Sequence, residues 1–521
     1  MKKINYLFEK RYFFLSFFLL FFFFIQSSIL YLHVYDGHHQ GLMFSNAIDL
    51  IDGNRPYDEI FIQYGILTTV IHSLALLLFG ESVYIINLTT LLFYYSSIFF
   101  IYLIIKKLTN DFLAFTGLMA LVFNHPTPWL PWSNYISFFF ITLAVCLFIY
   151  RNRYSSFLLG FFLSLATLSR QDYFVPIFSS LILFAVIFFS LKIKLLNLKL
   201  QEIFLGFFFP ILLFFLYLFF HNNFFEWVIY IKLPLLYLDN SNTNIFSLIF
   251  NFINFFLIES LSNFIITPQY FLIFFILILN LISLFFFLKN KDIKILFISI
   301  LSIFLSILSL NLELFRLYTS VSFGIITSLY LIYKINSQDV KKILIFLVYS
   351  TSFFSIFFYP NGNNSNFKKT DTSNKYTFSK IDIFKYQKWP HEKIKPLNTV
   401  KRLRDNIVLN CPIIYSDNLT FDSYYANILG LKRTRLFPYV KSDRNGQFLD
   451  DFFNNNFEKK INIEIINQNI ILLVSEDSQL LKNNRIIFTS KYSYKEINLN
   501  SIKDKPNIFK FYYPTKCYTK S

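Results

Sequence analysis

Long apolar runs alternate with short polar segments through the first 360 residues. The first run, Phe13–Leu32, has about 20 residues, the length at which an α-helix crosses the hydrocarbon core of a bilayer. The later runs lie at about residues 64–79, 83–105, 112–123, 134–150, 155–169, 173–191, 203–220, 244–258, 269–288, 295–310, 317–333 and 343–359. Several are shorter than a full span, so the pattern predicts an α-helical polytopic membrane protein with 10 to 13 transmembrane helices.

The pattern changes abruptly after Pro360. A polar stretch without apolar periodicity follows and predicts a linker over residues 361–384. The chain is therefore expected to contain a membrane module, residues 1–360, and a small C-terminal α/β domain, residues 385–521. Within that domain, short apolar runs predict strands and one helix. The strands are expected within residues 407–417, 461–477, 485–490 and 507–513, and the helix within 421–430.

Composition and charge give the orientation. The chain is 55% hydrophobic, with a mean hydropathy of +0.49. The N-terminal leader and the short basic clusters between apolar runs hold 17 of the 21 Lys and Arg residues of the membrane module. Because Lys and Arg favour the cytoplasmic side, we expect the protein in a bacterial inner membrane with its N-terminus in the cytoplasm. The loop after the first run and the C-terminal domain are then extracytoplasmic.

This orientation needs an odd number of crossings between the first loop and the cluster Lys106/Lys107. Two runs, 64–79 and 83–105, lie there. Either one of them is re-entrant, or the two lysines lie outside. The run 244–258 raises a similar parity problem and is expected along the outer surface.

The segment 33–63 collects five of the module's acidic residues, and we interpret it as an outer catalytic loop. Asp36 comes first, at the mouth of the first span. A carboxylate there suits a general base that takes a proton from an attacking hydroxyl. The alternative role is to cap the amphipathic helix that residues 40–52 predict, with Asn46 on its polar face.

Two histidines, His38 and His39, follow Asp36. Adjacent residues on a helix face different directions, so they are poorly spaced to share a metal ion. We expect no metal cofactor, with a divalent ion as the disfavoured alternative. His38 is instead a candidate for substrate contact.

The second half of the loop adds further candidates. Arg55 can reach a phosphate, and Tyr64 stands at the start of the next apolar run. Pro56 is expected to end the first short helix, and Tyr57–Glu59 to open another. Asp58 is a candidate substrate contact or a cap of that second helix.

Two cations interrupt the outer span ends. Arg170 and Asp172 either pair only with each other, or Arg170 contacts the substrate while Asp172 holds it. Arg316 opens a late span with Tyr318 beside it. Arg316 either snorkels to the interface or makes a bidentate phosphate contact.

These groups favour one substrate class. A lipid-linked sugar phosphate leaves as a phosphate whose charge grows in the transition state, and fixed Arg groups stabilise that charge. Its polyprenyl tail needs an apolar groove between spans, which this chain can supply. No Walker loop or dinucleotide glycine pattern is present, and the basic tail has no nucleic-acid motif.

Three features of the module resemble the GT-C superfamily of membrane glycosyltransferases, in its bacterial branch of aminoarabinose transferases and protein O-mannosyltransferases. They are Asp36 after the first span, Arg55–Gly80 ending in Leu-Phe-Gly, and Phe315–Gly324 with its Arg and Tyr. The resemblance implies inverting transfer from a polyprenyl-phosphate sugar to a lipid, polysaccharide or protein acceptor. Asp36 is then the base, and Arg316 holds the phosphate.

Two other functions remain open. A lipid or polysaccharide transporter usually carries charges within its spans and two similar halves, whereas here the spans are nearly free of charge. A non-catalytic subunit of an envelope assembly is the second alternative. It needs no carboxylate at residue 36.

Overall fold

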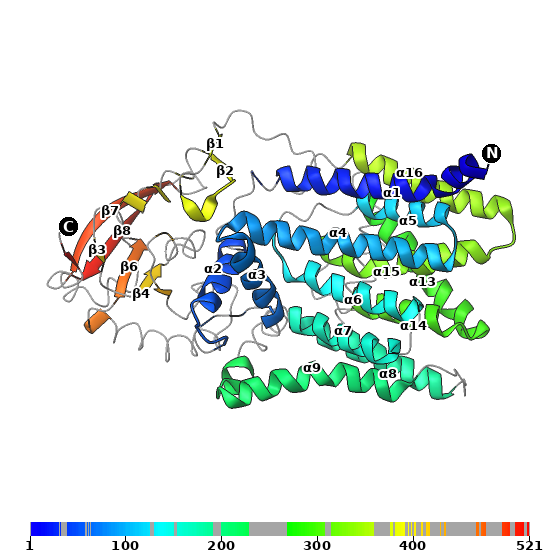
Figure 1. The fold of residues 1–521 in the computed structure, drawn as a ribbon, viewed down its shortest axis with the longest axis horizontal. Coiled ribbons are helices and arrows are strands. Elements are labelled where there is room, and N and C mark those ends of the chain that lie inside the picture. Colours follow the sequence, from blue (N-terminus) through cyan, green and yellow to red (C-terminus); the bar gives the residue numbers. More distant parts are fainter. Residues whose placement is uncertain are drawn as a thin grey trace.

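The computed structural model shows a bundle of long helices with a strand-rich domain beyond one end (Figure 1). It describes residues 2–30, 32, 39–57, 60, 62, 64–124, 130–150, 154–190, 199–228, 268–307, 314–358, 376–378, 381–390, 394, 397–398, 401–402, 408–409, 413–416, 428, 432–433, 465–467, 470–475, 492–500, 506–514 and 518–519. The helices are α1 (Lys2–Leu30), α2 (His39–Ile51), α3 (Ile66–Phe79), α4 (Val83–Leu108), α5 (Asp111–Asn124), α6 (Ser133–Tyr150), α7 (Ser155–Ser169), α8 (Phe174–Ser190), α9 (Leu200–Phe220), α13 (Pro268–Asn290), α14 (Ile293–Ile307), α15 (Leu314–Lys334) and α16 (Gln338–Phe358).

Among the described residues, six helices are long and apolar enough to cross a membrane, and five further apolar helices are shorter. Large apolar side chains lie exposed on the outside of the bundle, as on α9 with Leu205, Leu213 and Phe219. An aqueous protein could not expose this much apolar surface, whereas acyl chains cover it at no cost. The predicted α-helical polytopic membrane fold is confirmed, and the protein is an integral membrane protein. The exact number of crossings stays a prediction.

The basic clusters that the structure describes lie at one end of the bundle. Tyr150, at the end of α6, donates to the carbonyl of Leu103 near the end of α4 at 3.1 Å. Lys294, at the start of α14, donates to the carbonyl of Ile149 at 2.7 Å. We call this the basic end. It comprises residues 103–111, 149–150, 154–156, 199–202, 290–294 and 330–342, which the contacts of the bundle bring together.

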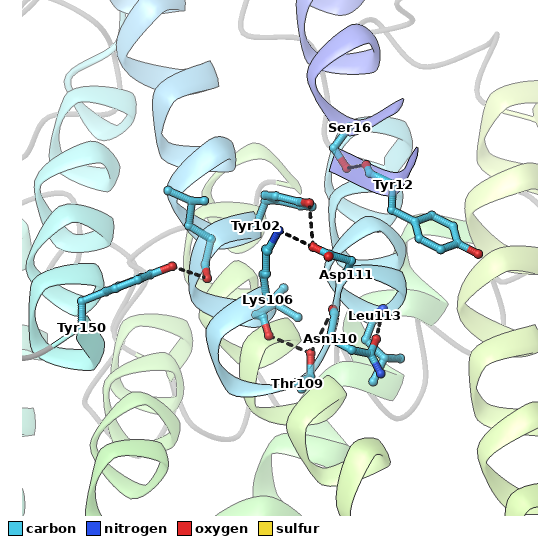
Figure 2. A network of polar contacts seen from close by, with 11 residues as sticks. Tyr12, Ser16, Tyr102, Lys106, Thr109, Asn110, Asp111, Leu113 and Tyr150 are labelled. Atoms are coloured by element: carbon cyan, nitrogen blue, oxygen red, sulfur yellow. Dashed lines mark hydrogen bonds and ion pairs between the residues drawn. The ribbon is translucent and has the colours of Figure 1, made fainter. Parts of the chain in front are cut away.

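A polar network closes the α4–α5 turn at the basic end (Figure 2). Asp111 accepts a hydrogen bond from Tyr102 at 3.3 Å and pairs with Lys106 at 2.6 Å. Asn110 caps α5 by accepting from the backbone N–H of Leu113 at 2.9 Å. The turn is thereby fixed between two helices that run in opposite directions.

The opposite end of the bundle, which we call the loop end, carries both termini of α3. In its first turn, the Thr68 hydroxyl donates a hydrogen bond of 2.9 Å to the carbonyl oxygen of Ser169, which ends α7. Its last residue, Phe79, is followed within three residues by Ser82, the N-cap of α4. Since α3 begins and ends at the loop end, it does not cross the bundle. The run 64–79 therefore stays at the loop end, and Lys106 lies at the basic end; the side of the membrane on which each end lies stays a prediction.

Two glycines let α7 and α9 cross in backbone contact. A Cβ on Gly160 would lie 1.9 Å from the carbonyl oxygen of Ile203, and one on Gly206 would lie 2.1 Å from that of Phe157. Any larger side chain would push the two helices apart. This close crossing of small residues is a common packing device of membrane helices.

The C-terminal region is a mixed α/β unit, as predicted. Its five-stranded sheet has the order β5-β4-β6-β8-β7, in which β4 is parallel to β5 and β6, and the remaining pairs are antiparallel. The strands are β1 (Tyr376–Phe378), β2 (Lys388–Pro390), β3 (Val408–Leu409), β4 (Ile413–Ser416), β5 (Lys432–Arg433), β6 (Ile470–Ser475), β7 (Tyr492–Asn500), β8 (Pro506–Pro514) and β9 (Tyr518–Thr519).

Several details differ from the predictions for this domain. The sequence did not predict β7, and Ile465 and Ile466 are helical where a strand was expected. The expected strand 485–490 lies outside the described residues. Within the expected linker, Tyr376–Phe378 forms β1, so the domain boundaries stay predictions.

The chain returns to the loop end before the sheet begins. Ser82 donates to the carbonyl of Lys385 at 2.9 Å, and the rings of Tyr84 and Tyr386 lie 6.0 Å apart. The strand domain therefore lies beyond the loop end, on the side of α2 and α3 (Figure 1).

Candidate functional site

The centre of the loop end is an ion pair between a buried arginine and a partly buried aspartate. Arg170 follows α7, and Asp172 lies in the 3-10 turn η2 (Gln171–Tyr173). Arg170 Nε contacts the two carboxylate oxygens at 2.7 and 3.0 Å, and its Nη2 donates to Oδ2 at 2.7 Å. The Arg170 side chain is only 6% exposed. Burial alone lowers the pKa of Arg170, but the Asp172 carboxylate raises it above its ordinary value, so the guanidinium stays charged.

Tyr64, a candidate from the end of the loop, contacts the guanidinium of Arg170 in this pair. Its ring centroid lies 5.6 Å from Arg170 Cζ, and that of Tyr173 lies 5.4 Å away on the same guanidinium. Gly65 makes the approach possible, because a Cβ there would lie 2.3 Å from the carbonyl oxygen of Leu168. Two aromatic faces hold the cation in place at low cost in entropy.

The same site touches the start of α15. The Tyr173 hydroxyl and Thr319 Oγ1 lie 3.2 Å apart. Arg316 is three residues before Thr319 in the same helix, so it occupies the preceding turn. The structure thus brings four predicted positions, Tyr64, Arg170, Asp172 and the turn that carries Arg316, to one place.

The loop between α2 and Tyr64 is a tight turn anchored on α9. Ile60 donates to the carbonyl of Arg55 at 3.1 Å, and Tyr57 donates to that of Ile60 at 3.0 Å. Tyr57 has φ +68°, a left-handed backbone that is unusual for a bulky residue. The prediction that a second helix opens at Tyr57 is wrong, because this left-handed residue and the bonds around it form a turn.

Burial holds Tyr57 in that strained conformation. Its side chain is 2% exposed, and its ring lies 6.0 Å from that of Phe214 in α9. Asn223, just after α9, donates to the carbonyl of Pro56 at 3.0 Å and holds the same turn. Arg55 is exposed beside Tyr217 of α9, with which it interacts electrostatically.

Solved structures with the same architecture identify the fold. ArnT from Cupriavidus metallidurans bound to undecaprenyl phosphate matches with a TM-score of 0.57 at 10% identity, over 98% of this chain and 100% of that one. The apo state of the same ArnT matches with a TM-score of 0.53 at 8% identity, over 95% of this chain and 97% of that one. A third match is the archaeal oligosaccharyltransferase AglB from Archaeoglobus fulgidus, in complex with an inhibitory peptide and a dolichol-phosphate. Its TM-score is 0.50 at 10% identity, over 97% of this chain and 74% of that one.

The chain has the GT-C fold. No protein-family model and no curated protein sequence matches it, so the likeness is visible only in three dimensions. It covers the membrane module and the C-terminal domain together, and it confirms the predicted resemblance at the level of the fold.

Within this GT-C fold, some predicted site residues lie outside the described residues. They are Asp36, His38 and Asp58. Arg316 and Tyr318 are described only as positions in α15. The helix predicted over 40–52 is confirmed as α2, but Asn46, expected on its polar face, is 2% exposed. Among the described residues no group of three His, Cys, Asp or Glu side chains could hold a metal ion, and the expectation of a metal-free site stays a prediction.

The sequence missed two members of this end of the GT-C fold, Ser133 and Asn134. They open α6 and are 1% and 0% exposed. The only signal was their place in a polar segment between spans, and their neutral side chains carry no motif.

Proposed function

We propose that this protein is a membrane glycosyltransferase that moves a sugar from a polyprenyl-phosphate donor to a lipid, polysaccharide or protein acceptor. The transfer takes place on the outer face of a bacterial inner membrane. The observation that carries the proposal is the GT-C fold over the whole chain, shared with proteins solved with undecaprenyl phosphate and with a dolichol-phosphate.

The arrangement of the loop end supports this reading. The chain leaves α1 after Leu30 and enters α2 at His39, and Asp36 lies between these positions. Near the α1 end, Ser28 interacts with Tyr84, at the start of α4. Thr319, one turn after Arg316 in α15, contacts Tyr173 of η2 at the same end. This arrangement supports the proposal that the base and the phosphate-binding cation act at the same end of the bundle.

The proposed reaction is a single displacement. The Asp36 carboxylate takes the proton of an acceptor hydroxyl while its oxygen bonds to the anomeric carbon. The bond from that carbon to the phosphate oxygen breaks, and polyprenyl phosphate leaves with the electron pair. Attack from the face opposite the phosphate inverts the configuration. Arg316 stabilises the charge that grows on the leaving phosphate.

The neighbouring groups have supporting roles in this scheme. Arg170 is held by Asp172 and by the rings of Tyr64 and Tyr173, so its position is fixed before substrate binds. A preorganised cation costs no reorganisation during the reaction. Arg55, exposed on the turn beside α9, is placed to meet the phosphate or the acceptor as these approach from the loop end.

A deletion strain tests the proposal. Its envelope glycans are compared by mass spectrometry with those of strains carrying the wild type, Asp36→Asn, or the matched control Asp52→Asn, an exposed acid of the same loop. We expect one sugar to be missing in the deletion and in Asp36→Asn, and to be restored by the control. Membrane levels and thermal stability of all three proteins are measured alongside.

Restoration of the sugar by Asp36→Asn would contradict the catalytic assignment. A transporter or a non-catalytic subunit predicts that result, because neither needs a base at residue 36. An unchanged glycan profile in the deletion strain would contradict glycosyl transfer altogether.

A further inference from the structure

The first turn of α6 contains buried polar atoms that no described residue partners. Ser133 Oγ and both amide atoms of Asn134 are sealed from solvent and have no hydrogen-bond partner among the described residues. More than nine-tenths of buried polar groups in native proteins are hydrogen-bonded, because an unpaired one keeps its full desolvation cost. Two adjacent side chains in this condition indicate a ligand.

The register between α6 and α7 places Ser133 beside Arg170. Ser137 donates to the carbonyl of Ala166 at 2.9 Å. The helices are antiparallel, since α6 ends at the basic end and α7 begins there. Ser133 is one turn before Ser137 on the same face, and Arg170 is one turn after Ala166. The two residues therefore stand at the same level, on facing sides.

The register between α6 and α15 places Asn134 beside Thr319. Phe138 packs edge-on against Phe323, with ring centroids 5.7 Å apart. Both helices run from the loop end to the basic end. One turn back along each gives Asn134 and Thr319, the residue that contacts Tyr173. The α6 start thus lies between the Arg170 pair and the turn that carries Arg316.

The groups that converge there include several hydrogen-bond donors. Ser133 offers a hydroxyl, Asn134 offers an amide NH₂, and the first turn of an 18-residue helix offers backbone N–H groups and the positive end of its dipole. No described residue accepts a hydrogen bond from Arg170 Nη1. A cluster of donors at a helix start is the arrangement that binds phosphate groups.

We propose that the start of α6, through Ser133 and Asn134, binds the phosphate of the polyprenyl donor together with Arg170. The inference rests on the proposed function and adds to it a second phosphate-binding element besides Arg316. It also gives two neutral residues a role in donor affinity.

Lipid binding by the full-length protein in neutral detergent tests this site. Undecaprenyl phosphate is titrated into the wild type, Ser133→Ala and Asn134→Leu. Asn280→Leu is the matched control, a buried asparagine whose amide is bonded to Thr327 and Ser299 in the bundle interior. Parallel titrations use inorganic phosphate as competitor and phosphatidylglycerol as an alternative lipid.

Both site variants are expected to bind undecaprenyl phosphate about tenfold more weakly, the usual effect of losing one hydrogen bond to a charged group. The Tm of ligand-free Asn134→Leu should stay equal or rise, because the lost amide had no partner. Asn280→Leu should lower the Tm and leave affinity unchanged. Inorganic phosphate should compete with the lipid.

Affinities within twofold of wild type in both variants would overturn the site. If Asn134→Leu does not fold, Ser133→Ala decides by itself. Failure of inorganic phosphate to compete, or an equal weakening of phosphatidylglycerol binding, would overturn recognition of the donor phosphate. A wild-type protein that does not bind undecaprenyl phosphate would overturn the proposed function as well, whereas binding that the variants leave intact removes only this inference.

Discussion

Arg170 carries a charge that almost no water reaches. Its guanidinium is neutralised by Asp172 and covered by two tyrosine rings, so the site has a fixed cation with little net charge. Such a pair contributes less to stability than its short distances suggest, since both groups lose hydration. Removing one partner is costly, because it leaves the other buried and unpaired.

Asp172→Asn and Arg170→Lys separate stability from recognition. Asp172→Asn should destabilise the protein by about 3 kcal/mol, since the buried guanidinium loses its counter-charge. Arg170→Lys keeps the charge but loses the planar fork, so it should bind undecaprenyl phosphate more weakly with a smaller loss of Tm. Thermal unfolding and lipid titration in detergent check both. Equal Tm for Asp172→Asn and wild type would contradict the pairing.

His72 predicts a pH dependence of stability. It lies on α3, fully buried, with Nε2 3.0 Å from Thr90 Oγ1. Burial lowers its pKa from 6.5 to about 3. The unfolded chain takes up a proton below pH 6.5 while the folded protein does not, so stability is full above that pH and is lost as pH falls toward 3.

At pH 5 the expected loss is about 2 kcal/mol relative to pH 7. His72→Gln removes the titrating group and keeps a polar side chain near Thr90, so its Tm should fall less between these two pH values. The Tm of both proteins, measured by scanning fluorimetry, checks this. Parallel pH profiles would show that another group sets the dependence.

Single residues of the site were predictable to different degrees. Arg170 and Asp172 are two apart in sequence, and a charge pair at the end of a span is conspicuous. The contact of Tyr64 with Arg170 joins segments far apart in the chain, so it needed the fold. Ser133 and Asn134 are neutral residues in a chain rich in Asn and Ser, and only their burial without partners distinguishes them.

At the scale of elements, the α7–α9 crossing is the tightest packing. Gly160→Ala should push the helices apart and lower the Tm by several degrees, because the new methyl would overlap the backbone of α9. Leu205→Ala, next to Gly206 but 64% exposed, is the matched control and should have little effect. Equal Tm for Gly160→Ala and wild type would contradict the backbone contact.

Two elements show where sequence patterns were insufficient. The run 64–79 is as apolar as a span, but α3 lies at the loop end and buries polar residues such as His72 against α2 and α4. The strand β7 alternates tyrosines with charged and polar residues. It lies at the edge of the sheet, where one flank is unpaired and polar side chains are tolerated.

For the whole molecule, the charge asymmetry predicts the orientation. The basic clusters among the described residues share one end, which should be cytoplasmic. A green fluorescent protein fused after Asn336, at the basic end, should fluoresce, and alkaline phosphatase fused there should be inactive. Phosphatase fused to the C-terminus, beyond the loop end, should be active. The reverse pattern would place the proposed catalytic face in the cytoplasm.

The whole-molecule architecture was predictable because apolar run length, basic clusters and a composition break at Pro360 are properties of the linear chain. The order in which helices pack is not. It depends on contacts such as Gly160 with Ile203 and Tyr173 with Thr319, which no local pattern specifies.

Tyr57 links the aqueous side of the protein to its lipid side. Its left-handed backbone persists only while Phe214 and Asn223 clasp the turn. A polyprenyl chain that displaced α9 would break the contacts that hold the turn and would move Arg55 with it. Under the proposed function, packing of the donor's tail against α9 would therefore change the position of Arg55 through this turn.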